Sequence, residues 1–225
     1  MNSNMLKLIA CLCMLVDHIG RILLDDNIIC TSIGRLAFPI FAYLLVEGLK
    51  NTRDIRKYIA RLLVFAVISE VPFNLAISGK ILYPYHQNVF FTLALGLAVI
   101  SCFEEKSPYR NMAGAALLIS CILAVVCKLD YNCAGILFIV SFYVFNPNRA
   151  GTDVRRRLKL NSMLLLVNGL ISILFIGISQ LVSLASLVPI NMYNGKRGRL
   201  KLKYFFYAFY PFHLLVLWWI KYYRA

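Results

Sequence analysis

Acidic side chains are scarce in this sequence, and charged residues of either sign make up only 15% of it. Asp and Glu together number 10 among 225 residues, whereas 60% of the residues are hydrophobic. A water-soluble domain of this length has too little interior to hide so much apolar surface. The shortage of charge therefore excludes a soluble globular protein and indicates a chain that lies mostly in lipid.

Several other signatures are missing from the sequence. It contains no linker, low-complexity tract or repeat of 20–50 residues, which favours one domain over 1–225. No Gly-rich phosphate loop occurs, and the seven cysteines do not suggest a disulfide framework. Cys11 and Cys13 would point about 200° apart on a helix, so we expect no metal site. The first apolar segment, 5–24, lacks a cleavage pattern and is expected to be a retained helix.

The net charge of +14 comes from 24 Lys and Arg residues, which gather in short segments between apolar runs. This arrangement is typical of membrane proteins, in which basic loops stay on the cytoplasmic side. It does not resemble the continuous basic face of a phosphate binder. We therefore expect the lipid bilayer, and not nucleic acid, as the partner.

Hydropathy predicts an all-α, polytopic membrane protein with about nine transmembrane helices. The 160–190 stretch is too long for one straight crossing, and Gly177 and Ser179 near its middle indicate a turn. The predicted spans are 5–24, 28–49, 58–77, 88–103, 111–127, 131–145, 159–175, 177–191 and 204–221.

Loop charge predicts the orientation of these spans. With the N-terminus in the cytoplasm, the inner segments hold 18 of the 24 basic residues. A single crossing over 160–190 would move the last five of those residues outside. The sequence therefore predicts a C-terminus outside, preceded by Trp218 and Trp219 at the interface.

Ionisable side chains recur within the predicted spans, where each costs on the order of 2.5–3.5 kcal/mol. Combined with the orientation, most of them fall in the outer half of the membrane, together with polar residues at the outer ends of other spans. Such convergence predicts a shared, partly hydrated cavity. The residues are Asp17, His18, Arg21, Arg35, Glu70, Asn74, His86, Asn88, Thr92, Asp130 and His213.

Each of these groups also has a purely structural interpretation. Asp17 and Arg21 are four residues apart on a helix and can neutralise one another. Glu47 lies near the cytoplasmic end of its span, where pairing with Lys50 is favoured over chemistry. His18 and His213 could be hydrogen-bonded interior residues.

Seven segments, in this order along the chain, resemble the TraX family. The resemblance extends from the first predicted helix to the last, and the order of the motifs makes it specific. The segments are MLVDHIG (14–20), GRLAFPIF (34–41), VEG (46–48), SEVPFN (69–74), NVFFTL (88–93), YNG (193–195) and YPFHL (210–214).

The resemblance implies an acetyltransferase of the bacterial inner or plasma membrane, since the family's named example N-acetylates conjugative pilin. It also implies kinship with transmembrane acyltransferases that use cytoplasmic acetyl-CoA and a suspected catalytic histidine. By motif that histidine is His18, surrounded by Asp17, Arg35, Glu70, Asn74, Asn88 and Thr92, with His213 on the closing helix. The acceptor does not carry over, and a peptide amine, a glycan or a lipid remains open.

Acyl transfer needs a base for the acceptor proton and a positive group for the oxyanion. We expect His18 to act as the base, with Glu70 or Asp130 orienting its imidazole. Arg35 with Asn88 would stabilise the intermediate, and Asp17 would hold Arg21. A two-step route through acetylated His18 is equally compatible.

Basic loops are candidates for the phosphates of acetyl-CoA, although their role in topology alone explains them. Two rival functions remain open. In a small transporter or flippase the charges would line a path, and in an assembly subunit they would bind a partner helix. The candidate phosphate ligands are Arg155, Arg156, Arg157, Lys196, Arg197 and Arg199.

Overall fold

The computed structural model describes residues 1–198 and 202–224. These residues form helices, and within them the only β pairing is an isolated parallel bridge between Gln87 and Leu129. In chain order the elements are α1 (Ser3–Leu23), α2 (Ile28–Gly34), α3 (Ala37–Asn51), α4 (Ile55–Ser78), α5 (Val89–Cys102), η1 (Arg110–Met112), α6 (Ala113–Val126), α7 (Asn132–Val144), η2 (Pro147–Ala150), α8 (Val154–Phe175), η3 (Ile178–Ser186), α9 (Leu187–Asn191) and α10 (Lys203–Arg224).

The nine predicted spans each match a helical segment, which confirms the all-α prediction. The second segment differs, because α2 ends at Gly34 and α3 begins at Ala37, with a two-residue turn at Arg35 and Leu36. The eighth also differs, because it starts as the 3-10 helix η3 and only its end is α-helical. Since a 3-10 helix rises about 2.0 Å per residue, η3 and α9 together extend about 25 Å.

Among the described residues, three stretches are long and apolar enough to cross a bilayer by length and composition: 28–51, 55–78 and 154–175. Helices α5 and α7, with 14 and 13 residues, are shorter. At 1.5 Å per residue they extend only about 20 Å, against roughly 30 Å of hydrocarbon. The structure thus supports a membrane protein, while the crossing of each segment and its orientation remain predictions.

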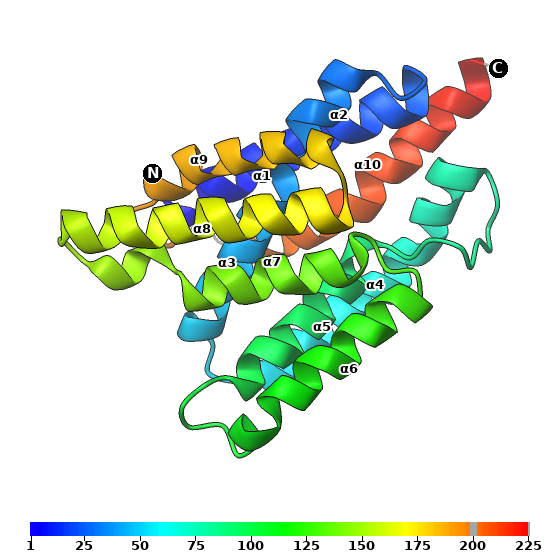
Figure 1. Cartoon of the computed structure of the whole chain (residues 1–225). Coiled ribbons are helices and arrows are strands. Elements are labelled where there is room, and N and C mark those ends of the chain that lie inside the picture. The colour runs from blue at the N-terminus through cyan, green and yellow to red at the C-terminus, as the bar shows by residue number, and fades with distance from the viewer. Residues whose placement is uncertain (199–201, 225) are drawn as a thin grey trace.

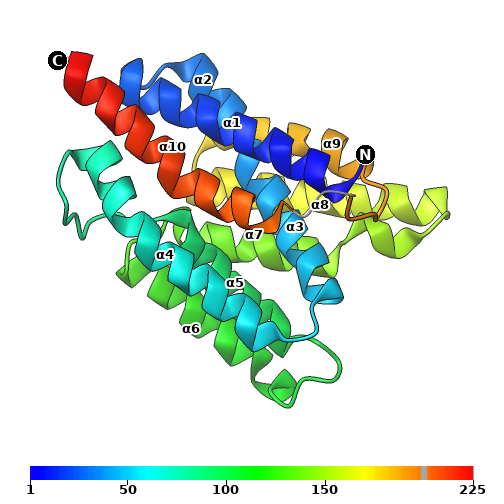
Figure 2. The ribbon, with the colours of Figure 1, turned by 180° about the vertical axis from the view of Figure 1, so that it is seen from behind.

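The turn predicted near the middle of 160–190 is present. Helix α8 ends at Phe175, and Gly177 follows with φ +124°, a backbone conformation that favours glycine. After this turn η3 runs back along α8, and the two lie side by side in Figures 1 and 2. The stretch is therefore a helical hairpin.

The connections between the helices divide into two groups at opposite ends of the bundle (Figures 1 and 2). One group, here called the basic end, contains the N-terminus, the α3–α4, α5–α6 and α7–α8 connections, and residues 192–198 after α9. The described parts of the predicted inner segments fall there. The opposite group, here called the cavity end, contains the α1–α2, α4–α5, α6–α7 and α8–η3 turns and the end of α10.

The core is built around α3, which is buried along nearly its whole length. Ile40, Ala42, Tyr43 and Val46 have no exposed surface, and they pack in one cluster with residues of α1, α4, α5, α7 and α10. Most of the large apolar residues that remain exposed lie on α4, α6, α8 and α10. This is the pattern expected when the outer faces of a bundle meet lipid.

Candidate functional site

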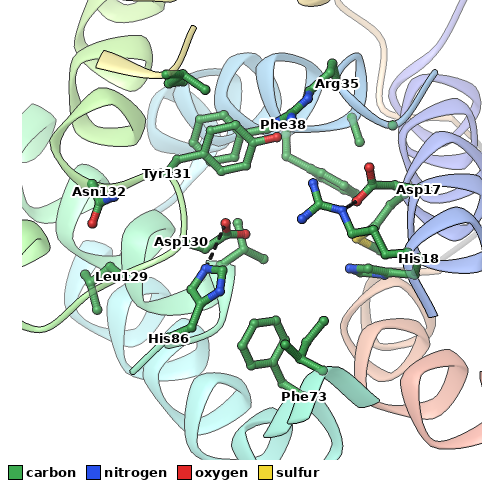
Figure 3. A pocket seen from close by; sticks show the side chains of 18 of the residues that line it. Asp17, His18, Arg35, Phe38, Phe73, His86, Leu129, Asp130, Tyr131 and Asn132 are labelled. Carbon is green, nitrogen blue, oxygen red and sulfur yellow. Dashed lines mark ion pairs between the residues drawn. The ribbon is translucent and has the colours of Figure 1, made fainter. Parts of the chain in front are cut away.

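A cavity of about 560 Å³ opens at the cavity end, which is a size typical of small-molecule sites. Its walls come from α1, the α2–α3 turn, the α4–α5 and α6–α7 loops, the α8–η3 turn and α10. Figure 3 shows polar side chains pointing into it from several of these elements. The first residues of α3, α5 and α7, Ala37, Val89 and Asn132, also line it.

An ion pair within α1 forms one wall. Arg21 Nε lies 2.8 Å from Asp17 Oδ2, which confirms the pairing expected from their spacing. The other carboxylate oxygen, Asp17 Oδ1, is buried and has no hydrogen-bond partner among the described residues. Next to it is Gly34 of α2, where an added Cβ would overlap the Asp17 side chain.

Replacing Gly34 with alanine is expected to destabilise the protein by about 1–3 kcal/mol, because the new methyl group must displace Asp17 or separate α1 from α2. The measurement is thermal unfolding in detergent. Gly114→Ala is the matched control, since a Cβ there has no atom of the described residues within 4 Å. Equal melting temperatures for the two variants would contradict the close α1–α2 approach.

The centre of the site is a pair of histidines from the first and last helices. His18 Nδ1 lies 2.7 Å from His213 Nε2, and the rings stack with centroids 5.0 Å apart. His213 Nδ1 lies 2.7 Å from the carbonyl oxygen of Phe209. Both histidines are buried, with 8% and 4% of their surface exposed. His18 lines the cavity, whereas His213 lies behind it.

These two contacts assign the protons of both rings. A carbonyl oxygen only accepts, so His213 Nδ1 carries a proton and donates it. In neutral His213 the Nε2 atom is then an acceptor, and His18 Nδ1 must be the donor. Neutral His18 is left with an unprotonated Nε2. A charged ring in this buried pair would be costly, which favours this neutral arrangement.

A third histidine, His86 in the α4–α5 loop, also lines the cavity. Its Nε2 lies 3.4 Å from Asp130 Oδ1, an ion pair visible in Figure 3. Asp130 is held in place through its carbonyl oxygen, which accepts a 2.6 Å hydrogen bond from Thr92 Oγ1. The hydrogen bond to Asp130 raises the pKa of His86 above its ordinary value, although partial burial opposes this.

The raised pKa of His86 predicts a pH dependence. Because its folded pKa exceeds the unfolded value of about 6.5, the His86–Asp130 pair stabilises the protein fully below that pH. The stabilisation is lost as the pH rises through the folded pKa. His86 is 37% exposed, so we expect only about 0.2–1 kcal/mol. Thermal unfolding between about pH 5 and 8 should show this decline, and His86→Gln should remove it.

Arg35 reaches the cavity from the turn between α2 and α3. Two aromatic rings lie beside it in Figure 3, those of Phe38 and Tyr131, which stack with centroids 4.1 Å apart. Asp17 and Asp130 are the carboxylates on the cavity wall. Arg35 is thus placed where a guanidinium could stabilise negative charge on a bound substrate.

Not all of the predicted site residues reach the cavity. Asp17, His18, Arg21, Arg35, His86 and Asp130 line it. The other predicted residues do not line it, and most of them hold the surrounding helices and loops. Asn88 donates from Nδ2 to Glu70 Oε2 at 2.6 Å and to the Ala66 carbonyl at 2.8 Å, Thr92 binds the Asp130 carbonyl, and Asn74 Nδ2 donates to the Ile81 carbonyl at 3.1 Å.

The group that orients His18 therefore differs from the predicted carboxylate. His213 occupies the Nδ1 side of the His18 ring, Glu70 binds Asn88, and Asp130 contacts His86. Which side chains of α4 and α10 face His18 depends on how each helix is rotated about its axis. Polarity and depth alone do not specify that rotation.

The predicted phosphate ligands lie outside this cavity. Arg155 and Arg156 are exposed in the first turn of α8, and Arg197 is exposed after α9. Arg199 lies outside the described residues. At the same basic end, Glu47 accepts a 2.8 Å hydrogen bond from Lys50, as expected, and also one of 2.9 Å from Asn146.

Sequence reasoning missed several lining residues and gave no role to His86. Lys128 and Tyr131 lie in the α6–α7 turn with φ of +53° and +62°. Non-glycine residues seldom adopt such angles, and no signal in the sequence indicates them here. Tyr210 was named only as the first residue of the YPFHL motif. Among the described residues no cluster of three or more metal-ligating side chains occurs.

A model of the TraX protein family matches residues 2–221. Protein TraX of Escherichia coli strain K12 is 32% identical over 95% of this chain and 85% of its own length. The probable fimbrial assembly protein FimC, serogroup H1, of Dichelobacter nodosus is 29% identical over 94% of this chain and 92% of its own length. No solved structure matches the chain.

Proposed function

This chain belongs to the TraX family, and we propose that it is an acetyltransferase of the bacterial inner or plasma membrane. It would move an acetyl group from cytoplasmic acetyl-CoA to an amine or hydroxyl at the outer side. The observation that carries the proposal is the hydrogen-bonded His18–His213 pair, which leaves an unprotonated nitrogen of His18 at the wall of a polar cavity. An imidazole in that state is a competent base or nucleophile.

In the direct route, His18 Nε2 takes the proton of the acceptor N–H or O–H while that atom attacks the thioester carbonyl. The carbonyl electron pair moves to oxygen, where the Arg35 guanidinium stabilises the resulting oxyanion. The C–S bond then breaks, and the coenzyme A thiolate takes the proton back from His18. Acetylated acceptor and free coenzyme A leave, and the His18 ring is neutral again.

His213 serves as a positioning residue in this mechanism. Its Nε2 accepts the Nδ1 proton of His18, which fixes the His18 tautomer and keeps Nε2 free. It takes the place predicted for Glu70 or Asp130. Asn88 is engaged with Glu70 and Ala66, so the oxyanion role is assigned to Arg35 alone.

The two-step route uses the same atoms. His18 Nε2 attacks the thioester carbonyl, the C–S bond breaks, and coenzyme A leaves as its thiolate. The acceptor then attacks the acetyl carbonyl, the bond from the acetyl group to Nε2 breaks, and the acceptor proton passes by way of the freed Nε2 to the thiolate. The name of the Dichelobacter relative refers to fimbrial assembly, which makes an amine of an exported pilus subunit one candidate acceptor. Hydroxyls of glycans or lipids are the others.

The proposal is tested with purified protein in liposomes supplied with acetyl-CoA. An acetyltransferase should consume the thioester, slowly in the absence of acceptor, and release coenzyme A thiol. Mass spectrometry of cell-surface material with and without the protein should then find the acetylated acceptor. A transporter or flippase would leave acetyl-CoA intact, so an unchanged thioester together with unchanged surface material would refute the proposal.

A further inference from the structure

A second cavity, of about 590 Å³, lies at the basic end of the bundle. It is a groove between the first turns of α1 and the first turns of α10, and Asn194, Lys196 and Gly198 close one side. Met5, Leu8, Phe205 and Phe206 form its apolar surface, and Lys196 lines its edge. We propose that this groove binds the nucleotide end of acetyl-CoA. The inference rests on the proposed function, because it supplies the donor for the same reaction.

The side of the groove that carries Lys196 is held firmly against α1. Ser3 N donates to the Lys196 carbonyl at 2.8 Å, and Asn194 N donates to the Met1 carbonyl at 2.9 Å. Gly198 then turns with φ +89°, close to the side chains of Asn2 and Asn4. The segment therefore presents Lys196 on a fixed backbone.

The charge around the groove suits an anion. Lys7 is a second cation beside the groove, in addition to Lys196. Its Nζ atom lies 5.5 Å from the centre of the Phe206 ring, which is part of the groove surface. Neither contributing part of the sequence contains an acidic residue, since Asp and Glu are absent from 1–16 and from every position after 153. A site bordered by cations without nearby carboxylates attracts phosphates.

The apolar surface points to a nucleotide carrying a long organic chain. The Phe205 ring is 53% exposed and offers a face on which a base can stack. Met5 and Leu8, also about half exposed, offer contact for an apolar chain. A phosphorylated nucleotide with a pantetheine arm has all three features, namely the anion, the aromatic base and the chain.

The groove also lies on the two helices that carry the histidine pair. Leu8 precedes His18 by ten residues on α1, which is about 15 Å along the helix, and Phe206 precedes His213 by seven, about 10 Å. Helices α1 and α10 pack against each other. An arm that follows these two helices from the groove would bring its thioester toward His18 from the basic end.

The test measures binding of coenzyme A and the KM for acetyl-CoA with the whole protein in zwitterionic lipid nanodiscs. Leu8→Trp fills the groove. It is expected to weaken the binding of coenzyme A and to raise the KM for acetyl-CoA, each by at least about tenfold. Leu118→Trp on α6, also exposed, is the matched control and should leave both unchanged. Lys196→Gln changes only an exposed side chain, and we expect about tenfold weaker binding.

The outcomes separate this inference from the proposed function. If the wild-type protein consumes acetyl-CoA and Lys196→Gln binds coenzyme A as tightly as wild type, this groove is not the donor site. The same conclusion follows if anionic phospholipid fills the groove without changing the KM for acetyl-CoA. If the wild-type protein neither binds coenzyme A nor consumes its thioester, both proposals fail.

Discussion

Replacing His18 with glutamine is expected to lower acetyl transfer by about 10²- to 10⁴-fold, the range typical for loss of a general base. Glutamine keeps a polar side chain of similar length at the position, but its amide cannot take up a proton at neutral pH. The measurement is turnover of acetyl-CoA by the purified variant at saturating donor. Its thermal unfolding should be compared with wild type, so that misfolding is not mistaken for loss of chemistry.

The control for this experiment is Leu12→Ala, an exposed position on the same helix that lines neither described cavity. It should retain normal turnover. A folded His18→Gln variant that works within a few-fold of wild type would remove His18 from the reaction. Rapid denaturation near neutral pH without acceptor, followed by prompt intact-mass measurement, separates the two routes, because only the two-step route leaves an acetyl group on His18.

Replacing His213 with phenylalanine is expected to lower kcat by about 5- to 150-fold. The phenyl ring keeps the stacking, but it offers no acceptor for His18 Nδ1. The loss of one buried hydrogen bond, about 1–3 kcal/mol, corresponds to that range. Without the acceptor, His18 can place its proton on Nε2, where it blocks the reaction.

His213→Gln distinguishes positioning from packing. The glutamine amide can donate to the Phe209 carbonyl and accept from His18, so it can restore part of the lost kcat. If His213 only fills space, phenylalanine should be tolerated at least as well as glutamine. The KM for acetyl-CoA should stay near the wild-type value in both variants, and a change in KM alone would contradict the assigned role.

Much of the fold follows from sequence because lipid imposes strong rules on it. Apolar runs of sufficient length and basic loops predict the order of the helical segments, including the turn at Gly177. Pairs within one helix are equally predictable, because residues three or four apart share a face. Asp17 with Arg21 and Glu47 with Lys50 are such pairs.

Contacts between helices that are far apart in the sequence were harder to predict from the sequence. His18 and His213 are 195 residues apart, and their hydrogen bond depends on the rotation of α1 and α10 about their own axes. Polarity and depth grouped Glu70 with the other polar residues, but they could not tell that its carboxylate binds Asn88, just before α5. The convergence of polar residues at one end was thus predictable, whereas the partner of each residue required coordinates.

The three helices that begin at the cavity, α3, α5 and α7, have an electrostatic consequence. Each helix N-terminus carries roughly half a positive elementary charge from its aligned peptide dipoles. With the first residues of all three lining one cavity, the backbone itself contributes a positive field there. This field is fixed before any substrate arrives and is little screened by salt. It should persist in variants that lack the Arg35 side chain, so part of the stabilisation of a developing oxyanion belongs to the architecture.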